Sequence, residues 1–122
     1  MGGPVGWILD ERDRERLLER FVPRFERVIA HHVTQWGHRR RAPVPAPAML
    51  AIVGHVADAS IEALLVTVDG RIERPDGSRY HCTWSLDPAS GRVPKDANAM
   101  IAETDWTSVD PLPVSAAPGY VA

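Results

Sequence analysis

Two short triplets of histidine and threonine are the residues of this sequence best suited to chemistry. The first is His32-Val33-Thr34 and the second is His81-Cys82-Thr83, and each lies inside an apolar, β-prone run. In a β-strand, residues i and i+2 project from the same face about 6–7 Å apart. Each triplet therefore predicts an imidazole and a hydroxyl side by side on one face of a strand.

Two such faces brought together would flank a phosphodiester without needing a metal ion. An imidazole has an ordinary pKa of about 6.5, so one histidine can accept a proton from the attacking water while the other protonates the leaving oxygen. The threonine hydroxyls can hydrogen-bond the non-bridging oxygens, where charge develops. His31 competes with His32 for the first role, because neighbouring residues of a strand face opposite sides.

The strand around the second triplet separates an apolar face from a polar one. The apolar face consists of Tyr80, Cys82, Trp84 and Leu86. The polar face consists of His81, Thr83 and Ser85, so Ser85 is a third candidate phosphate ligand. Cys82 is the only cysteine, is expected to be an inert core thiol, and is typical of a reducing, cytoplasmic compartment.

Further side chains near the triplets are candidate nucleotide contacts. Arg92 and Lys95 precede a predicted helix N-terminus, whose free amides attract phosphate. Trp36 shares the face of His32 and can stack a nucleobase. The arginines at 39–41 are candidates for an RNA backbone. For each of these charged residues, solvated surface charge is the alternative interpretation.

A metal site is not favoured by the spacing of the histidines. No pair of histidines stands four residues apart on a predicted helix, and Cys82 faces away from His81. No acidic residue occurs at ligand spacing either. We therefore expect neither a metal nor another cofactor.

The length and composition are those of a single globular domain. The chain has 122 residues, of which 44% are hydrophobic and 25% charged. A net charge of −2 argues against a general nucleic-acid coat or a basic membrane binder. No run approaches the roughly 20 apolar residues of a membrane span.

The pattern predicts an α+β fold with a mainly antiparallel sheet of about four strands. Strands are expected at 26–36, 49–57, 61–69 and 78–86, with a helix at 10–22 and a short helix at 95–104. The predicted division is a flexible N-terminus at 1–8, the α+β domain at 9–106 and a Pro-rich tail at 107–122, flexible or laid along the surface.

The two triplets resemble the His-x-Ser/Thr motifs of the two-histidine (2H) phosphoesterase superfamily. The run from Glu62-Ala63-Leu64 to residues 80–86, followed by Gly91-Arg92 and Asn98, is similar to compact RNA-repair modules. These include the cyclic phosphodiesterase modules associated with RNA ligases.

This resemblance implies a hydrolase that opens a 2′,3′-cyclic phosphate on an RNA end or small nucleotide without a metal ion. It implies catalytic roles for His32 and His81, and phosphate-contacting roles for Thr34 and Thr83. Two other classes of function remain open. A nucleotide- or phosphate-binding module predicts that a nucleotide raises the melting temperature without being hydrolysed. An interaction domain predicts neither effect, together with an exposed apolar patch.

Overall fold

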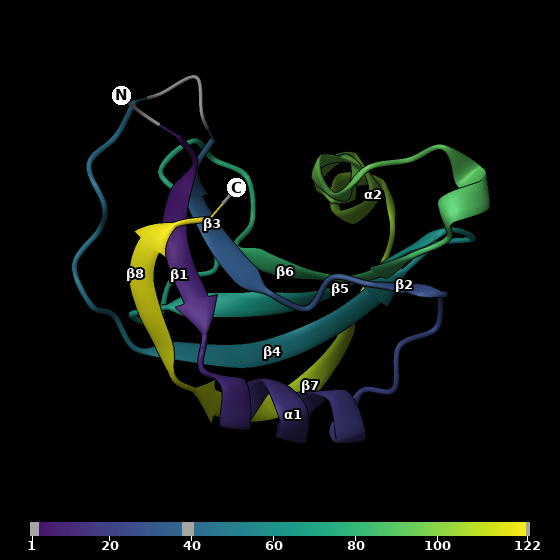
Figure 1. Ribbon diagram of the computed structural model, residues 1–122, viewed down its shortest axis with the longest axis horizontal. Coiled ribbons are helices and arrows are strands. Elements are labelled where there is room, and N and C mark those ends of the chain that lie inside the picture. Colours follow the sequence, from purple (N-terminus) through teal and green to yellow (C-terminus); the bar gives the residue numbers. More distant parts are fainter. Residues whose placement is uncertain (1–2, 38–40, 122) are drawn as a thin grey trace.

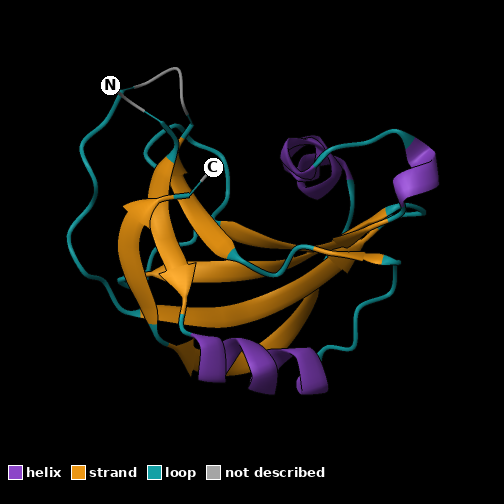
Figure 2. Ribbon diagram, viewed as in Figure 1, coloured by secondary structure: helices purple, strands orange, loops and turns teal. Residues whose placement is uncertain are grey.

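The computed structural model describes residues 3–37 and 41–121, which form an α+β fold with two antiparallel sheets and two α-helices (Figures 1 and 2). The smaller sheet has the order β3 (His32–Trp36), β1 (Val5–Leu9), β8 (Ala116–Tyr120). The larger sheet has the order β2 (Arg27–Val28), β6 (His81–Leu86), β5 (Ile61–Val68), β4 (Leu50–Ala57), β7 (Thr107–Val114). The helices are α1 (Glu11–Arg20) and α2 (Ala97–Glu103), with short 3-10 turns at Pro88–Ser90 and Pro94–Asp96.

The predicted helices and hairpins have clear local causes. Asp10 caps α1 by accepting a hydrogen bond from the Asp13 amide at 3.2 Å, and Pro23 follows shortly after the helix ends. The turn between β4 and β5 is held by Asp58, whose carboxylate accepts from the amides of Ser60 and Ile61 at 2.9 Å. The α+β class is confirmed, whereas the structure has more strands than the expected four.

Residues 5–9, 107–114 and 116–120 form strands of the two sheets, although the sequence predicts a flexible N-terminus and a Pro-rich tail in these regions. Val5–Leu9 is the central strand of the smaller sheet, and Val5 and Trp7 are buried. The Pro-rich segment forms β7 and β8, each an edge strand, which is where a sheet tolerates proline. Both terminal segments therefore pair with the sheets of the α+β fold.

The predicted strand 26–36 is divided between the two sheets. The amides of Ile29 and Ala30 donate to the carbonyls of Trp84 and Thr83 at 2.9 and 3.0 Å, so the chain follows β6 up to this point. Ala30 then adopts a φ of 44°, and the chain leaves β6 to pair with β1. As a result β3, which carries the first triplet, diverges from β6, which carries the second.

The core occupies both faces of the larger sheet. Trp7, Val33 and Trp84 belong to the cluster between the sheets. Leu65 and Met100 belong to the second cluster, under α2. Because both faces of β5 and β6 are covered, the polar side chains of β6 lie between packed layers, unlike those of a solvent-facing strand.

Candidate functional site

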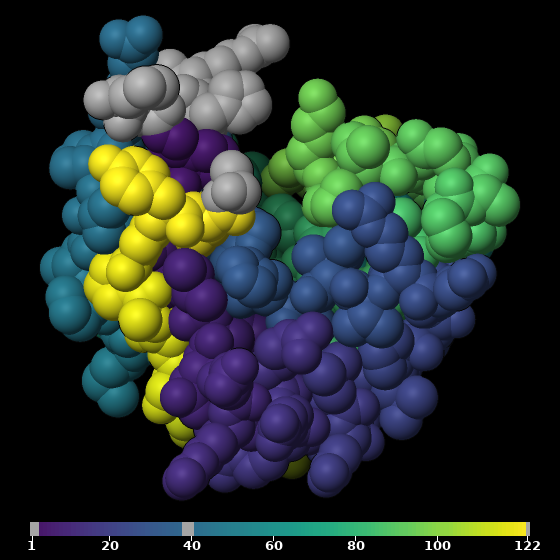
Figure 3. Space-filling view, in the orientation of Figure 1, coloured from purple at the N-terminus to yellow at the C-terminus, as the bar shows by residue number. Residues whose placement is uncertain are grey.

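The two triplets meet at a cleft between the smaller sheet and α2. The surface is hollowed there, between the three-stranded sheet and the green segment that contains α2 (Figure 3). The backbone of His31 and His32 lies near the sulfur of Cys82, and the preceding Ala30 amide donates to the Thr83 carbonyl at 3.0 Å. The start of β3 therefore lies against the start of β6. We call this the histidine cleft, with His32, Thr34 and Trp36 on β3 and His81 and Thr83 on β6.

His81 is almost fully buried, and its surroundings favour one tautomer. It is the first residue of β6, pairs with Leu65 of β5 and is 9% exposed. Its Nδ1 lies 3.0 Å from the carbonyl oxygen of Arg79. A carbonyl can only accept, so Nδ1 carries the proton and Nε2 keeps a free lone pair. Burial lowers the pKa of His81, and the nearby Arg74 guanidinium lowers it further.

His32 is half-buried at the start of β3. Its Nδ1 lies 3.0 Å from Nδ1 of the exposed His31. Burial, together with the charges of His31 and His81, lowers the pKa of His32 to about 4. The electrostatic effect of His81 indicates that the two triplet histidines share one environment.

The two threonines contribute unequal hydroxyls. Thr83 is 9% exposed and donates to the carbonyl of Pro94 at 3.3 Å, which leaves its oxygen lone pairs for other donors. Thr34 is half-buried on the same face of β3 as His32. The hydroxyl oxygen of Thr83 therefore suits a protonated group, whereas Thr34 can still donate to an oxyanion.

Trp36 and Lys95 flank the cleft. Trp36 ends β3, half-buried on the face of His32 and Thr34. Lys95 directly follows Pro94, the residue that binds Thr83, and its side chain is exposed. Both positions are compatible with the contacts expected from the sequence.

Ser85 does not belong to the cleft, contrary to its predicted role as a phosphate ligand. Its hydroxyl is fully buried, donates to Glu62 at 2.7 Å and accepts from the Phe25 amide at 3.2 Å. Glu62 is itself buried and also bonds the His55 ring at 2.7 Å. Ser85 is thus part of an internal network that holds β5 against β6.

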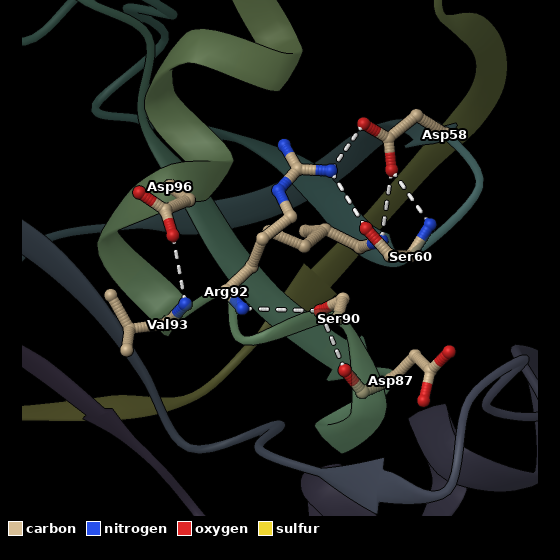
Figure 4. A network of polar contacts seen from close by, with 8 residues as sticks. Asp58, Ser60, Asp87, Ser90, Arg92, Val93 and Asp96 are labelled. Carbon is tan, nitrogen blue, oxygen red and sulfur yellow. Dashed lines mark hydrogen bonds and ion pairs between the residues drawn. The ribbon is translucent and has the colours of Figure 1, made fainter.

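Arg92 is also separated from the histidines. Its guanidinium reaches the β4–β5 turn, where it contacts Asp58 at 2.6 Å and Ser60 at 2.8 Å (Figure 4). This turn adjoins the Leu86 end of β6, because Ile61 pairs with Leu86 while Leu65 pairs with His81. The structure therefore does not bring Arg92 together with the two histidines.

The arginine run lies mostly outside the described residues. This holds for Arg39 and Arg40, and for the neighbouring His38. Arg41 is described and its side chain is exposed.

Arg74 and Asn98 are cleft residues that the sequence reasoning did not identify as ligands. Arg74 donates from Nε to the carbonyl of Gln35 at 3.2 Å, and from Nη1 to Oδ1 of Asn98 at 3.3 Å. It therefore connects β3 with α2 at one end of the cleft. In the sequence, Arg74 stands among turn residues, a position typical of an exposed charge. It becomes buried only when residues 71–79 fold as a hairpin.

Within residues 3–37 and 41–121, no three His, Cys, Asp or Glu side chains are grouped as a metal site would require. None of the helices in the same ranges is long and apolar enough to cross a membrane. Comparison of the chain with protein-family models, curated proteins and solved structures found no match. Inference about function therefore rests on the cleft.

Proposed function

We propose that the protein is a metal-independent phosphodiesterase that opens a 2′,3′-cyclic phosphate on an RNA end or small nucleotide. The observation that supports this most is the closeness of His32 and His81, which begin two different strands and interact electrostatically. The two imidazoles are accompanied there by the threonine of each triplet. The proposal includes a cytoplasmic location, supported by the unpaired Cys82.

His81 is the general base in this proposal. Its Nδ1–H is held by the Arg79 carbonyl, so Nε2 accepts a proton from water as the water oxygen attacks phosphorus. The bond from phosphorus to one ribose oxygen breaks, and protonated His32 gives its proton to that oxygen. The product is a ribose phosphomonoester with one free hydroxyl.

The low pKa of His32 couples substrate binding to proton uptake. In the free protein the imidazole is neutral at pH 7, because its pKa is about 4. An anionic phosphate a few ångströms away favours the imidazolium and raises this pKa. The acid required for the leaving oxygen is therefore formed when the substrate arrives.

The remaining contacts position the phosphate. Thr34 donates its hydroxyl hydrogen to a non-bridging oxygen, and the exposed ammonium of Lys95 adds positive charge at the other side of the cleft. Trp36 stacks the base beside the reacting phosphate.

The test is turnover of a 2′,3′-cyclic nucleotide with EDTA present, for wild type, His32→Ala and His81→Ala. Each variant should lose about 10²- to 10⁴-fold in rate, the usual contribution of a general acid or base. His31→Ala serves as the matched comparison, because His31 is exposed beside His32. A loss in His31→Ala equal to that in His32→Ala would transfer the role to His31. Full activity in His81→Ala would overturn the proposal.

One observation favours a second candidate, a nucleotide- or phosphate-binding module without turnover. A histidine with a pKa of about 4 is a poor proton donor at neutral pH unless the ligand changes it. A binding module predicts that a nucleotide raises the melting temperature while the cyclic phosphate stays closed. Thermal unfolding and product analysis on the same samples distinguish the two functions.

A further inference from the structure

A cavity of about 1020 Å³ lies next to the histidine cleft, on the other side of β3. Its walls are the loop of residues 45–48, the end of β5, the segment 71–75, and the side chains of Trp7, Gln35 and Tyr80. Gln35 and Trp36 are neighbours in β3, so their side chains face opposite sides of the strand. The cavity therefore adjoins the cleft without being part of it.

Arg74 is the residue that the two spaces share. It lines the cavity, while Asn98, which accepts its Nη1 hydrogen bond, belongs to α2 at the cleft. Its charge acts on both His81 and Tyr80, which are adjacent in sequence and face the cleft and the cavity respectively. A ligand in the cleft that continues past Arg74 would enter the cavity.

Each guanidinium nitrogen of Arg74 has a partner among the described residues, but most of these partners are neutral. Its side chain is 7% exposed, and the cost of burying a guanidinium is recovered only by well-placed partners. Two of its partners are the neutral oxygens of Gln35 and Asn98. The carboxylate of Asp76 lies 3.5 Å from Nη2 and is 39% exposed, so it compensates the charge weakly. A phosphate oxygen would supply a stronger anionic partner than these contacts do.

The other walls suit a nucleoside better than a second polyanion. Apart from Arg74, the lining holds one arginine, Arg71, and two carboxylates, Asp69 and Glu73, so it does not favour a second polyanion. The hydrogen-bonded side chains of Tyr80 and Gln35 offer donors and acceptors. The prolines of the 45–48 loop offer flat apolar surface.

We propose that this cavity binds the nucleotide that precedes the reacting end, with Arg74 on the phosphate that joins the two. The preferred substrate is then an RNA end of at least two nucleotides, which binds more tightly than a cyclic mononucleotide. This inference rests on the proposed function for the identity of the reacting group. The subsite can nevertheless be measured by binding alone.

The experiment compares the affinity of a ribodinucleotide ending in a 3′-phosphate with that of a 3′-mononucleotide, by calorimetry on the whole chain. Wild type should bind the dinucleotide at least about tenfold more tightly, because a charge-assisted hydrogen bond and a buried nucleoside are added. Ala46→Trp should remove this preference and leave mononucleotide affinity unchanged, since Ala46 lines the cavity from an exposed position. Val44→Trp, on the same loop but outside the lining, should keep it.

Equal wild-type affinity for the two ligands would overturn the subsite, as would a full preference in Ala46→Trp. Turnover is measured separately on the same proteins. A dinucleotide preference without turnover would contradict the phosphodiesterase and leave the subsite standing. Turnover without a preference would contradict only the subsite.

Discussion

The unusual titration of His32 leads to a prediction about how stability depends on pH. Its pKa is lowered to about 4, by burial first and then by His31 and His81, whereas in the unfolded chain it has its ordinary value near 6.5. Above pH 6.5 neither state binds this proton, so the full contribution of the neutral ring to stability is present. Between pH 6.5 and 4 only the unfolded chain takes the proton, so that contribution is lost as the pH falls.

The magnitude follows from the size of the pKa difference. The change from 6.5 to about 4 corresponds to about 3 kcal/mol, and we discount this to about 2 kcal/mol because the half-buried ring is partly screened by water. His81 acts in the same direction, since its pKa is also lowered. A comparison of wild type with His32→Gln therefore isolates the contribution of His32.

Urea unfolding at pH 7.5 and pH 4.5 measures the contribution of His32 to the free energy of unfolding. The stability of wild type relative to His32→Gln should decrease by about 2 kcal/mol between the two conditions. A difference that stays constant, or that grows at low pH, would refute the reasoning. NMR titration of His32 provides the direct check, with a midpoint near 4 that rises when inorganic phosphate is added.

Two further predictions concern buried polar groups. Glu62→Ala should lower the free energy of unfolding in urea by about 3–5 kcal/mol, because it leaves Ser85, His55 and the Arg24 amide without their acceptor. Glu62→Gln should retain most of the stability. A loss below 1 kcal/mol in Glu62→Ala would contradict this role of Glu62. Cys82 should be inert to a thiol reagent in the native protein and fully reactive in urea, because burial raises its pKa to about 12; rapid native labelling would show that the β6 core opens.

The elements with strong local signals could be predicted from the sequence. The helix after Asp10 and the hairpin of β4 and β5 have turn and capping residues that act within a few positions. The alternation in 80–86 correctly separated the core face of Cys82 and Trp84 from the face of His81. Periodicity and capping are local properties of the sequence, so they can be recognised without knowledge of the tertiary structure.

Other features depended on contacts between distant residues. The terminal strands were missed because proline and glycine usually mark loops, while here β7 and β8 are edge strands. In β1, Gly6 is needed because a Cβ there would collide with the Val33 carbonyl. The break at Ala30 has no residue signal, since alanine rarely adopts positive φ.

The candidate site shows the same division between local and tertiary information. The sequence identified the histidines and threonines by type and spacing. The sequence suggests Arg92 as a positively charged phosphate ligand, but Arg92 is paired with Asp58. The sequence gives no sign of Arg74, which the 71–79 hairpin buries at the cleft. The alternation of side chains predicts that Ser85 shares a face with His81, which suggests a ligand role. It does not predict what covers that face of the strand.

The central claim, that His32 and His81 act as a unit on one phosphate, is tested most directly by a double-mutant cycle. The rate of opening of a 2′,3′-cyclic phosphate is measured with EDTA for wild type, His32→Ala, His81→Ala and the double variant. Residues that act together are non-additive, so the double variant should be about as slow as the slower single variant. Losses that simply multiply would contradict the account, as would retention of the wild-type rate in either single variant.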